Sequence, residues 1–278
     1  MTMTVEWVDR ARQVAPSAGH AELLGQGQLS VAVAVDEHVV RFPRHQLGVE
    51  QIRTERGLVP QLRAIDQVNL PTPEHADLTL PIGQAFAVHR LVPGQILTPG
   101  LWDALPDNDR TRLIDQLSSF LTGLAAIRPG DTGVPTRPLS ELAQQMADDV
   151  ARLLAPRMSS VARRRATREL TDLAGIERSE PATVCHTDLG GNLVWDAVQH
   201  RLGVIDFGGA VMSDPVLDLA SLTVLGAAVA ARVADRTPHL AGRLDDAQVI
   251  RRTFALQDAL LSAKQERWPD VAAVLDTY

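Results

Sequence analysis

The segment HTDLGGNLVWDAVQHRLGVIDFGG, residues 186–209, combines charge, glycine and apolar runs in one short span. It holds three aspartates, an asparagine, two histidines and five glycines. The runs NLVWD and RLGVIDF, together with ATVCH just upstream, have the length and composition of short buried strands. The polar residues lie just beyond the strand ends, on loops that we expect a small sheet to hold. We therefore expect the chemistry of this protein on these loops.

The composition indicates a folded globular protein with one large domain or two modest lobes. The chain has 278 residues, of which 45% are apolar, and this is ample for a packed core. Its formal net charge of −7 argues against a nucleic-acid-binding protein, which usually has a basic face. Neither the N-terminus nor the apolar segment 220–231 has the pattern of a signal peptide or a membrane span. We expect a cytoplasmic protein without nucleic-acid or membrane partners.

Two amino-acid counts restrict the chemistry. Cys185 is the only cysteine, which excludes an intrachain disulfide and a cysteine-rich metal site. Its neighbour His186 should point to the opposite face of the strand, so a Cys-His dyad is not expected. Lys264 is the only lysine, so every other permanently charged basic side chain belongs to an arginine.

Apolar periodicity changes near residue 94. Before this point, AELLGQG, SVAVAVD and HVVRFPR are short β-branched segments separated by turn residues, which predicts an antiparallel meander. A helix over residues 46–65 and a strand in AFAVHRLV follow.

After residue 94, the apolar residues recur with the helical period. Four segments have this pattern, namely residues 107–127, 138–158, 160–176 and 247–263. We therefore predict an α+β fold with a small β-rich N-terminal lobe, residues 1–94, and a larger, mainly helical C-terminal lobe, residues 95–278.

Three side chains of the opening segment suit phosphoryl transfer. This reaction needs a carboxylate near the attacking hydroxyl, oxygen ligands for magnesium, and cations or backbone donors for the nucleotide phosphates. Asp188 and Asn192 lie on one loop, and Asp206 ends the next strand. A kinase-like site gathers its base and its metal ligands from two adjacent loops in this way.

The motifs HTDLGGN, GVIDFGG and SDPVLDLA, in this order, resemble those of the aminoglycoside phosphotransferases and their choline-kinase-like relatives. Looser similarity in GQGQLSVAVAVDEHVVRFPR and RLVPGQIL extends the resemblance over most of the chain. It implies a two-lobed, protein-kinase-like fold. By the same resemblance, Asp188 orients the substrate hydroxyl or accepts its proton, while Asp206 and Asn192 hold Mg²⁺ against the phosphates of ATP or GTP. His186 would brace the loop.

Two features depart from the pattern of that family. Only three residues separate Asp188 from Asn192, where the family normally has four, and this makes Asn192 the less secure metal ligand. Arg41 stands where a kinase-like site usually has a lysine on the third strand, and Glu55 on the next helix is its expected partner. Arginine can still bind phosphate oxygens through two N–H groups. Alternatively, Arg41 and Glu55 are ordinary surface charges.

The remaining nucleotide-binding candidates lie in two loops. The segment GQGQLS, with Gly25, Gly27 and Ser30, would offer backbone N–H groups to the phosphates, although a GxG sequence is also common in hairpin turns. Residues His89, Arg90 and Val92 would link the lobes and offer backbone groups to a purine.

Asp214 and Asp218 are expected to have a mainly structural role. Asp214 precedes a proline, as a helix N-cap does, and Asp218 falls in the first turns of that helix, where negative charge is favourable. A cationic substrate is the other partner that one of them could meet.

The substrate implied by the resemblance is a cationic antibiotic. Residues 95–278 contain 24 acidic and 19 basic side chains, which is compatible with binding a cation. DLGGNLVW and RRTFALQDAL resemble the branch that contains the viomycin and capreomycin phosphotransferases; aminoglycosides are the next candidates. The alternatives are a kinase of a small amino alcohol, amino acid or sugar, a nucleotide-binding pseudoenzyme, and a metal-dependent hydrolase using His186, Asp188 and Asp206. The oligomeric state stays open.

Overall fold

The structure is a computed structural model that describes residues 2–17, 19–127, 133–176 and 182–278. The chain forms two compact units, one of residues 1–134 and 191–210 and the other of residues 135–190 and 211–278. The predicted lobes, residues 1–94 and 95–278, were defined by the change in sequence pattern and do not correspond to these units. The boundary at residue 94 stays a prediction. Among the described residues, no helix is both long and apolar enough to cross a membrane.

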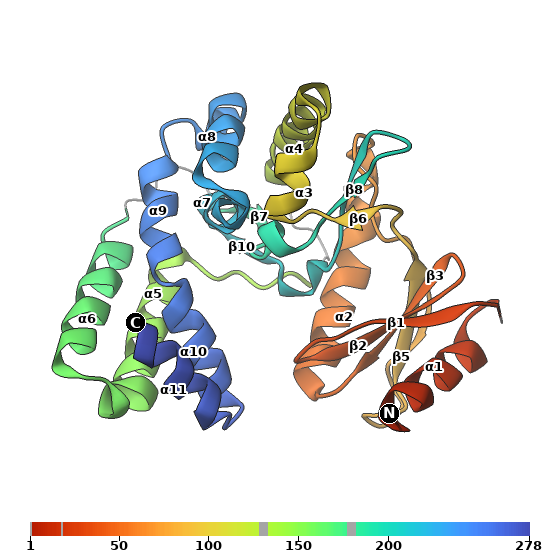
Figure 1. The fold of residues 1–278 in the computed structure, drawn as a ribbon, viewed down its shortest axis with the longest axis horizontal. Helices are drawn as coiled ribbons and strands as arrows, with labels where there is room; N and C mark the ends of the chain where they lie inside the picture. Colours follow the sequence, from red (N-terminus) through yellow and green to blue (C-terminus); the bar gives the residue numbers. More distant parts are fainter. Residues whose placement is uncertain (1, 18, 128–132, 177–181) are drawn as a thin grey trace. The chain divides into compact units, whose positions relative to one another are not determined.

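The first unit is built on a five-stranded antiparallel sheet with the strand order β1-β2-β3-β5-β4 (Figure 1). Its strands are β1 (Ala21–Gln26), β2 (Ser30–Val35), β3 (His38–Pro43), β4 (Pro73–Asp77) and β5 (Phe86–Arg90). The meander β1-β2-β3 and strand β5 coincide with the predicted segments. Strand β4 has no alternating apolar pattern, and the sequence did not indicate it.

The alternation of side chains gives this sheet two different faces. On one face, Val33 and Phe42 join an apolar cluster with Trp7 and Ala11 of helix α1 (Thr2–Val14), and Figure 1 shows this helix beside the sheet. Residues of the opposite parity in β2, β3 and β5 face the other way and line a cavity. One face therefore supplies the core and the other lines a cavity.

Further elements complete the first unit. The helix predicted over 46–65 is α2 (Gln46–Leu58) followed by the 3-10 turn η1 (Val59–Ala64), because Pro60 cannot donate the backbone hydrogen bond of a continuing α-helix. The other elements are β6 (Gln95–Ile96), α3 (Pro99–Ala104), α4 (Asp107–Ala126), β8 (Leu193–Asp196), β9 (Arg201–Val204) and the turn η5 (Phe207–Gly209). Strands β6, β8 and β9 form a three-stranded sheet in that order.

The second unit is mainly helical. Its helices are α5 (Leu139–Asp149) with the π-helical segment η2 (Val150–Leu154), α6 (Ser160–Ala174), α7 (Val216–Leu222), α8 (Ala227–Arg236), α9 (Leu244–Arg252), α10 (Phe254–Lys264) and α11 (Trp268–Thr277). Short turns connect some of them, namely η3 (Ala155–Arg157), η6 (Thr223–Leu225) and η7 (Pro238–Leu240); the turn η4 (Leu189–Gly191) lies at the boundary of the units.

Two expectations for this region need correction. The runs ATVCH, NLVWD and RLGVIDF were expected to form one small sheet, but β7 (Thr183–Cys185) pairs with β10 (Val211–Ser213), whereas β8 pairs with β6 on one side and β9 on the other. The helix predicted over 247–263 is interrupted at Thr253, whose hydroxyl donates to the Ile250 carbonyl oxygen at 2.7 Å. Side-chain hydrogen bonds of this kind compete with regular helix.

Candidate active site

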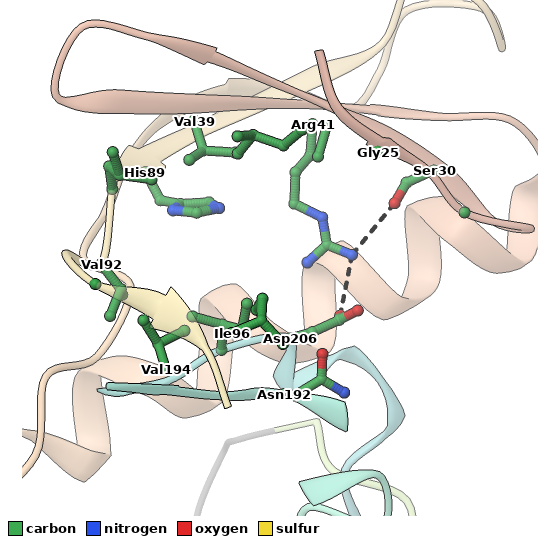
Figure 2. Close-up of a pocket in the computed structure, with 16 residues that line it drawn as sticks. Gly25, Ser30, Val39, Arg41, His89, Val92, Ile96, Asn192, Val194 and Asp206 are labelled. Carbon is green, nitrogen blue, oxygen red and sulfur yellow. Dashed lines mark hydrogen bonds and ion pairs between the residues drawn. The ribbon is translucent and has the colours of Figure 1, made fainter. Parts of the chain in front are cut away.

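A cavity of about 380 Å³ lies within the first unit, against the face of the five-stranded sheet that α1 does not cover (Figure 2). The predicted residues that line it are Gly25, Gly27, Ser30, Arg41, His89, Val92, Asn192 and Asp206. Glu55 lies behind Arg41 and is buried. Arg90 is exposed, and its side chain pairs with Glu37 at 2.8 Å and Glu74 at 3.3 Å. The structure thus brings together eight of the eleven predicted site residues around one cavity. The other three, Glu55, Arg90 and Asp188, do not line it.

Arg41 lines this cavity and forms ion pairs with two carboxylates. One of its terminal nitrogens donates to Glu55 Oε2 at 3.0 Å, and the other donates to Asp206 Oδ1 at 3.0 Å and to Ser30 Oγ at 3.3 Å. Only 8% of Arg41 is exposed. Burial alone lowers the pKa of Arg41, but the carboxylates of Glu55 and Asp206 outweigh it and raise the pKa above its usual range. The guanidinium of Arg41 therefore stays protonated, and Glu55 and Asp206 hold it from two sides.

The backbone at Asp206 is held in an unusual conformation. Its φ of 62° lies in the left-handed region, which costs a non-glycine residue roughly 1–3 kcal/mol. The next residue stabilises the turn, because the N–H of Phe207 donates to Glu55 Oε2 at 2.9 Å and its ring packs edge-on against Phe120. Glu55 thus fixes both Arg41 and the turn that carries Asp206. The Asp206 side chain is 45% exposed and faces the cavity (Figure 2).

The donor set of the cavity fits a magnesium ion. Asp206 supplies a carboxylate and Asn192 an amide oxygen, and both line the same cavity. Mg²⁺ is commonly bound by one or two carboxylates together with substrate phosphates and water. The described residues include no group of three or more His, Cys, Asp or Glu side chains that could hold a metal. These donors therefore suit a cation that a nucleotide helps to hold, whereas a transition-metal site of a hydrolase would require more nitrogen or sulfur ligands.

Asp188 lies on a braced loop of the second unit. The carboxylate of Asp218, which is only 1% exposed, accepts hydrogen bonds from the backbone N–H groups of His186 at 3.0 Å and Thr187 at 2.7 Å. Thr187 has a φ of 74°, so this turn also needs external support. His186 is buried, and its Nδ1 accepts from the Asp188 N–H at 3.3 Å. Asp188 itself is exposed and presents its carboxylate at the surface of this unit.

The sequence did not reveal the main role of Asp218. It indicated a residue suited to a helix dipole, whereas the side chain supports a loop about thirty positions upstream. Burial raises the pKa of Asp218, although His186 and the two backbone donors act in the opposite direction. Asp214 is not the N-cap of α7, because Pro215 occupies that position; its carboxylate accepts from the Val216 N–H at 3.0 Å and pairs with Arg243 at 3.2 Å. Arg243 had no signal in the sequence that set it apart from other arginines.

Gly190 allows the loop to pack against helix α7. Its N–H donates to Ser221 Oγ at 2.8 Å, and a Cβ atom added to it would lie 2.2 Å from the Ser221 carbonyl oxygen. We expect Gly190→Ala to lower the free energy of unfolding by about 2–3 kcal/mol, because backbone must shift to relieve the overlap. Chemical denaturation measures this. In the control Gly175→Ala, the nearest atom lies at 3.4 Å and stability should hardly change; equal stability of both variants would contradict the prediction.

Comparisons with known proteins agree with this geometry. The family model described as "Phosphotransferase enzyme family" matches residues 20–256. Viomycin phosphotransferase from Streptomyces vinaceus is 30% identical over 273 residues, which cover 91% of each chain. The GDP complex of wild-type aminoglycoside 2′-phosphotransferase-IIIa has a TM-score of 0.85 and 24% identity, over 98% of this chain and 96% of that one. A streptomycin-ATP-APH(2″)-IIa ternary complex has a TM-score of 0.74 and 15% identity, over 98% and 95%. The predicted kinase-like fold, β-rich and then helical, is confirmed.

Proposed function

Because the chain belongs to the phosphotransferase enzyme family, we propose that it transfers the γ-phosphoryl group of a purine nucleoside triphosphate to a hydroxyl group of a cationic antibiotic. The observation that carries this proposal is the match to viomycin phosphotransferase along nearly the whole chain. A tuberactinomycin such as viomycin or capreomycin is the first substrate to test, and aminoglycosides are the second. Such a reaction would make the protein an antibiotic-resistance enzyme.

The proposal assigns the proton transfer to Asp188. The substrate oxygen attacks the γ-phosphorus, the bond from this phosphorus to the β,γ-bridging oxygen breaks, and the hydroxyl proton passes to the Asp188 carboxylate. A base in this role must be open to the substrate while its position is fixed. Asp188 meets both conditions, since its side chain is exposed and its loop is held by Asp218 and His186.

The proposal assigns nucleotide binding to the cavity of the first unit. Arg41 and the backbone of Gly25 to Ser30 would contact phosphate oxygens, and the fork of a guanidinium can do so through two N–H groups. A Cβ atom added to Gly25 would meet nothing within 4 Å, so the turn leaves open space beside the cavity. Asp206 and Asn192 would hold magnesium, which when bound neutralises charge on the phosphates.

A cationic substrate is also supported by the charge of the chain. The formal net charge is −7, and residues 95–278 carry most of the acidic excess. Acidic surfaces raise the local concentration of a polycation and speed its association. Charge alone does not distinguish a cyclic peptide from an aminoglycoside, so the experiment has to do so.

A panel of acceptors tests the proposal. Purified protein with magnesium and either ATP or GTP would be incubated with viomycin, capreomycin, kanamycin, streptomycin, a macrolide and several amino alcohols and sugars. We expect one class of antibiotic to gain the mass of a single phosphoryl group. Transfer only to an amino alcohol or sugar would show a metabolite kinase instead. Nucleotide binding without any transfer would show a pseudoenzyme.

A further inference from the structure

His89 places an imidazole ring inside the cavity. It lies on β5 opposite Val39 of β3, and both residues line the cavity. Figure 2 shows the ring extending from β5 into the cavity, in the direction of Arg41. The nucleotide-binding role expected for this segment involves only the backbone around His89, so it leaves this half-buried polar side chain unexplained.

One hydrogen bond fixes the tautomer of this ring. Nδ1 of His89 lies 2.9 Å from the carbonyl oxygen of Arg90, and this is the only hydrogen bond of the His89 side chain to the described part of the chain. A carbonyl oxygen can only accept, so Nδ1 must carry the proton. Burial lowers the pKa of His89, which keeps the ring neutral at neutral pH. Nε2 therefore has a free lone pair and is a hydrogen-bond acceptor.

The surroundings of the ring suit a flat aromatic base. Ala32, Val39, Val92, Val194 and Ile205 supply apolar side chains to the same cavity. Figure 2 shows the guanidinium of Arg41, the hydroxyl of Ser30 and Gly25 together at the other end of the cavity. If the phosphates occupy that end, as proposed above, the base lies among the apolar side chains, beside His89.

We propose that His89 Nε2 accepts a hydrogen bond from the exocyclic amine of adenine, so that this protein favours nucleotides of 6-aminopurines over those of 6-oxopurines. This inference rests on the proposed function. Adenine presents an N–H donor at position 6, whereas guanine and hypoxanthine present an oxygen there, and two acceptors facing each other repel. A protonated imidazole could donate to that oxygen, but its burial opposes the charge. Guanine could offer its N1–H to Nε2 only if it bound at a different position in the cavity from adenine.

Binding measured by calorimetry tests the proposal on the wild-type protein. The probes are ATP, ITP, GTP and purine riboside triphosphate, which has no group at position 6, each with magnesium. We expect ATP to bind about tenfold or more tightly than each of the others, because the others lack a donor at position 6 that matches the acceptor Nε2. A preference for GTP, or equal binding of ATP and purine riboside triphosphate, would overturn the proposal.

Two variants locate the effect. His89→Leu replaces the imidazole with an apolar side chain and so removes the acceptor. The dissociation constants of ATP and ITP should then differ by no more than about threefold. His75→Leu is the matched control, since the His75 ring also bonds a backbone carbonyl, that of Val14 at 2.7 Å, but is exposed on β4 and outside the cavity. This control should keep the wild-type ratio.

The outcomes separate the inference from the function on which it rests. Thermal melts would first establish that both variants are folded. If His89→Leu kept the wild-type ratio between ATP and ITP binding, the role of His89 would be refuted and the proposed function would be unaffected. If wild-type protein bound no nucleotide, the proposed function and the inference would both fall.

Discussion

Asp188→Asn is expected to lower kcat by a factor of about 10² to 10⁴, the range that a positioned general base contributes. The amide has nearly the shape of the carboxylate but cannot accept the hydroxyl proton. The loop should keep its structure, because its hydrogen bonds to Asp218 and His186 come from backbone N–H groups. Steady-state kinetics with the accepted antibiotic measures the change.

The variant also separates catalysis from nucleotide binding. Asp188 is not among the residues that line the cavity with Arg41 and Asp206, so the dissociation constant for magnesium nucleotide should stay within about twofold, as expected when no direct contact is removed. Asp276→Asn, which changes an exposed carboxylate on α11, controls for the loss of charge. Turnover of Asp188→Asn close to that of wild type would refute the role of Asp188 as base.

Much of the cavity around Arg41 could be predicted because local patterns determine it. Arg41 lies on a strand and Glu55 on the helix that follows, and a strand followed by a packed helix places such residues within reach of each other, as their 3.0 Å ion pair shows. Asp206 could be found from the order of motifs around it. Its left-handed backbone and its bond to Arg41 had no signal in the sequence, because tertiary contacts create both.

The parts that could not be predicted depend on distant contacts. Strand β7 is only three residues long, and the sequence gives no reason to pair it with β10 rather than with β8. The neutral tautomer of His89 depends on a single carbonyl oxygen and on burial in the folded protein. The roles of the predicted site residues, including Asn192 as a metal ligand and Arg90 at the purine, all stay predictions.

The brace formed by Asp218 leads to the second large effect. Asp218→Ala removes the acceptor of two backbone N–H groups, those of His186 and Thr187. We expect the free energy of unfolding to fall by about 2–4 kcal/mol, because buried donors without partners cost 1–3 kcal/mol each. We also expect kcat to fall by about 10² at a temperature where the variant is folded, since a small displacement of Asp188 from its substrate has that cost.

Asp196→Ala is a matched control for this experiment. Asp196 is also buried, and its carboxylate accepts from two backbone N–H groups, those of Val198 at 2.9 Å and Gln199 at 3.1 Å, in the turn between β8 and β9. Its loss should reduce stability less, by about 1 kcal/mol, because Val198 and Gln199 are exposed and water can replace the carboxylate as their acceptor. However, this turn does not hold Asp188, so kcat should stay near the wild-type value.

A third variant distinguishes positioning from general stability. Asp218→Asn keeps one acceptor oxygen and should recover part of kcat, while its amide group faces the second N–H and prevents full recovery. Nucleotide affinity should be the same in all three variants, because neither Asp218 nor Asp196 lines the cavity that we propose for the nucleotide. An equal fall of kcat in Asp218→Ala and Asp196→Ala would contradict a specific role of Asp218. A fall confined to the Asp218 variants would show that this carboxylate acts by holding the backbone that carries Asp188.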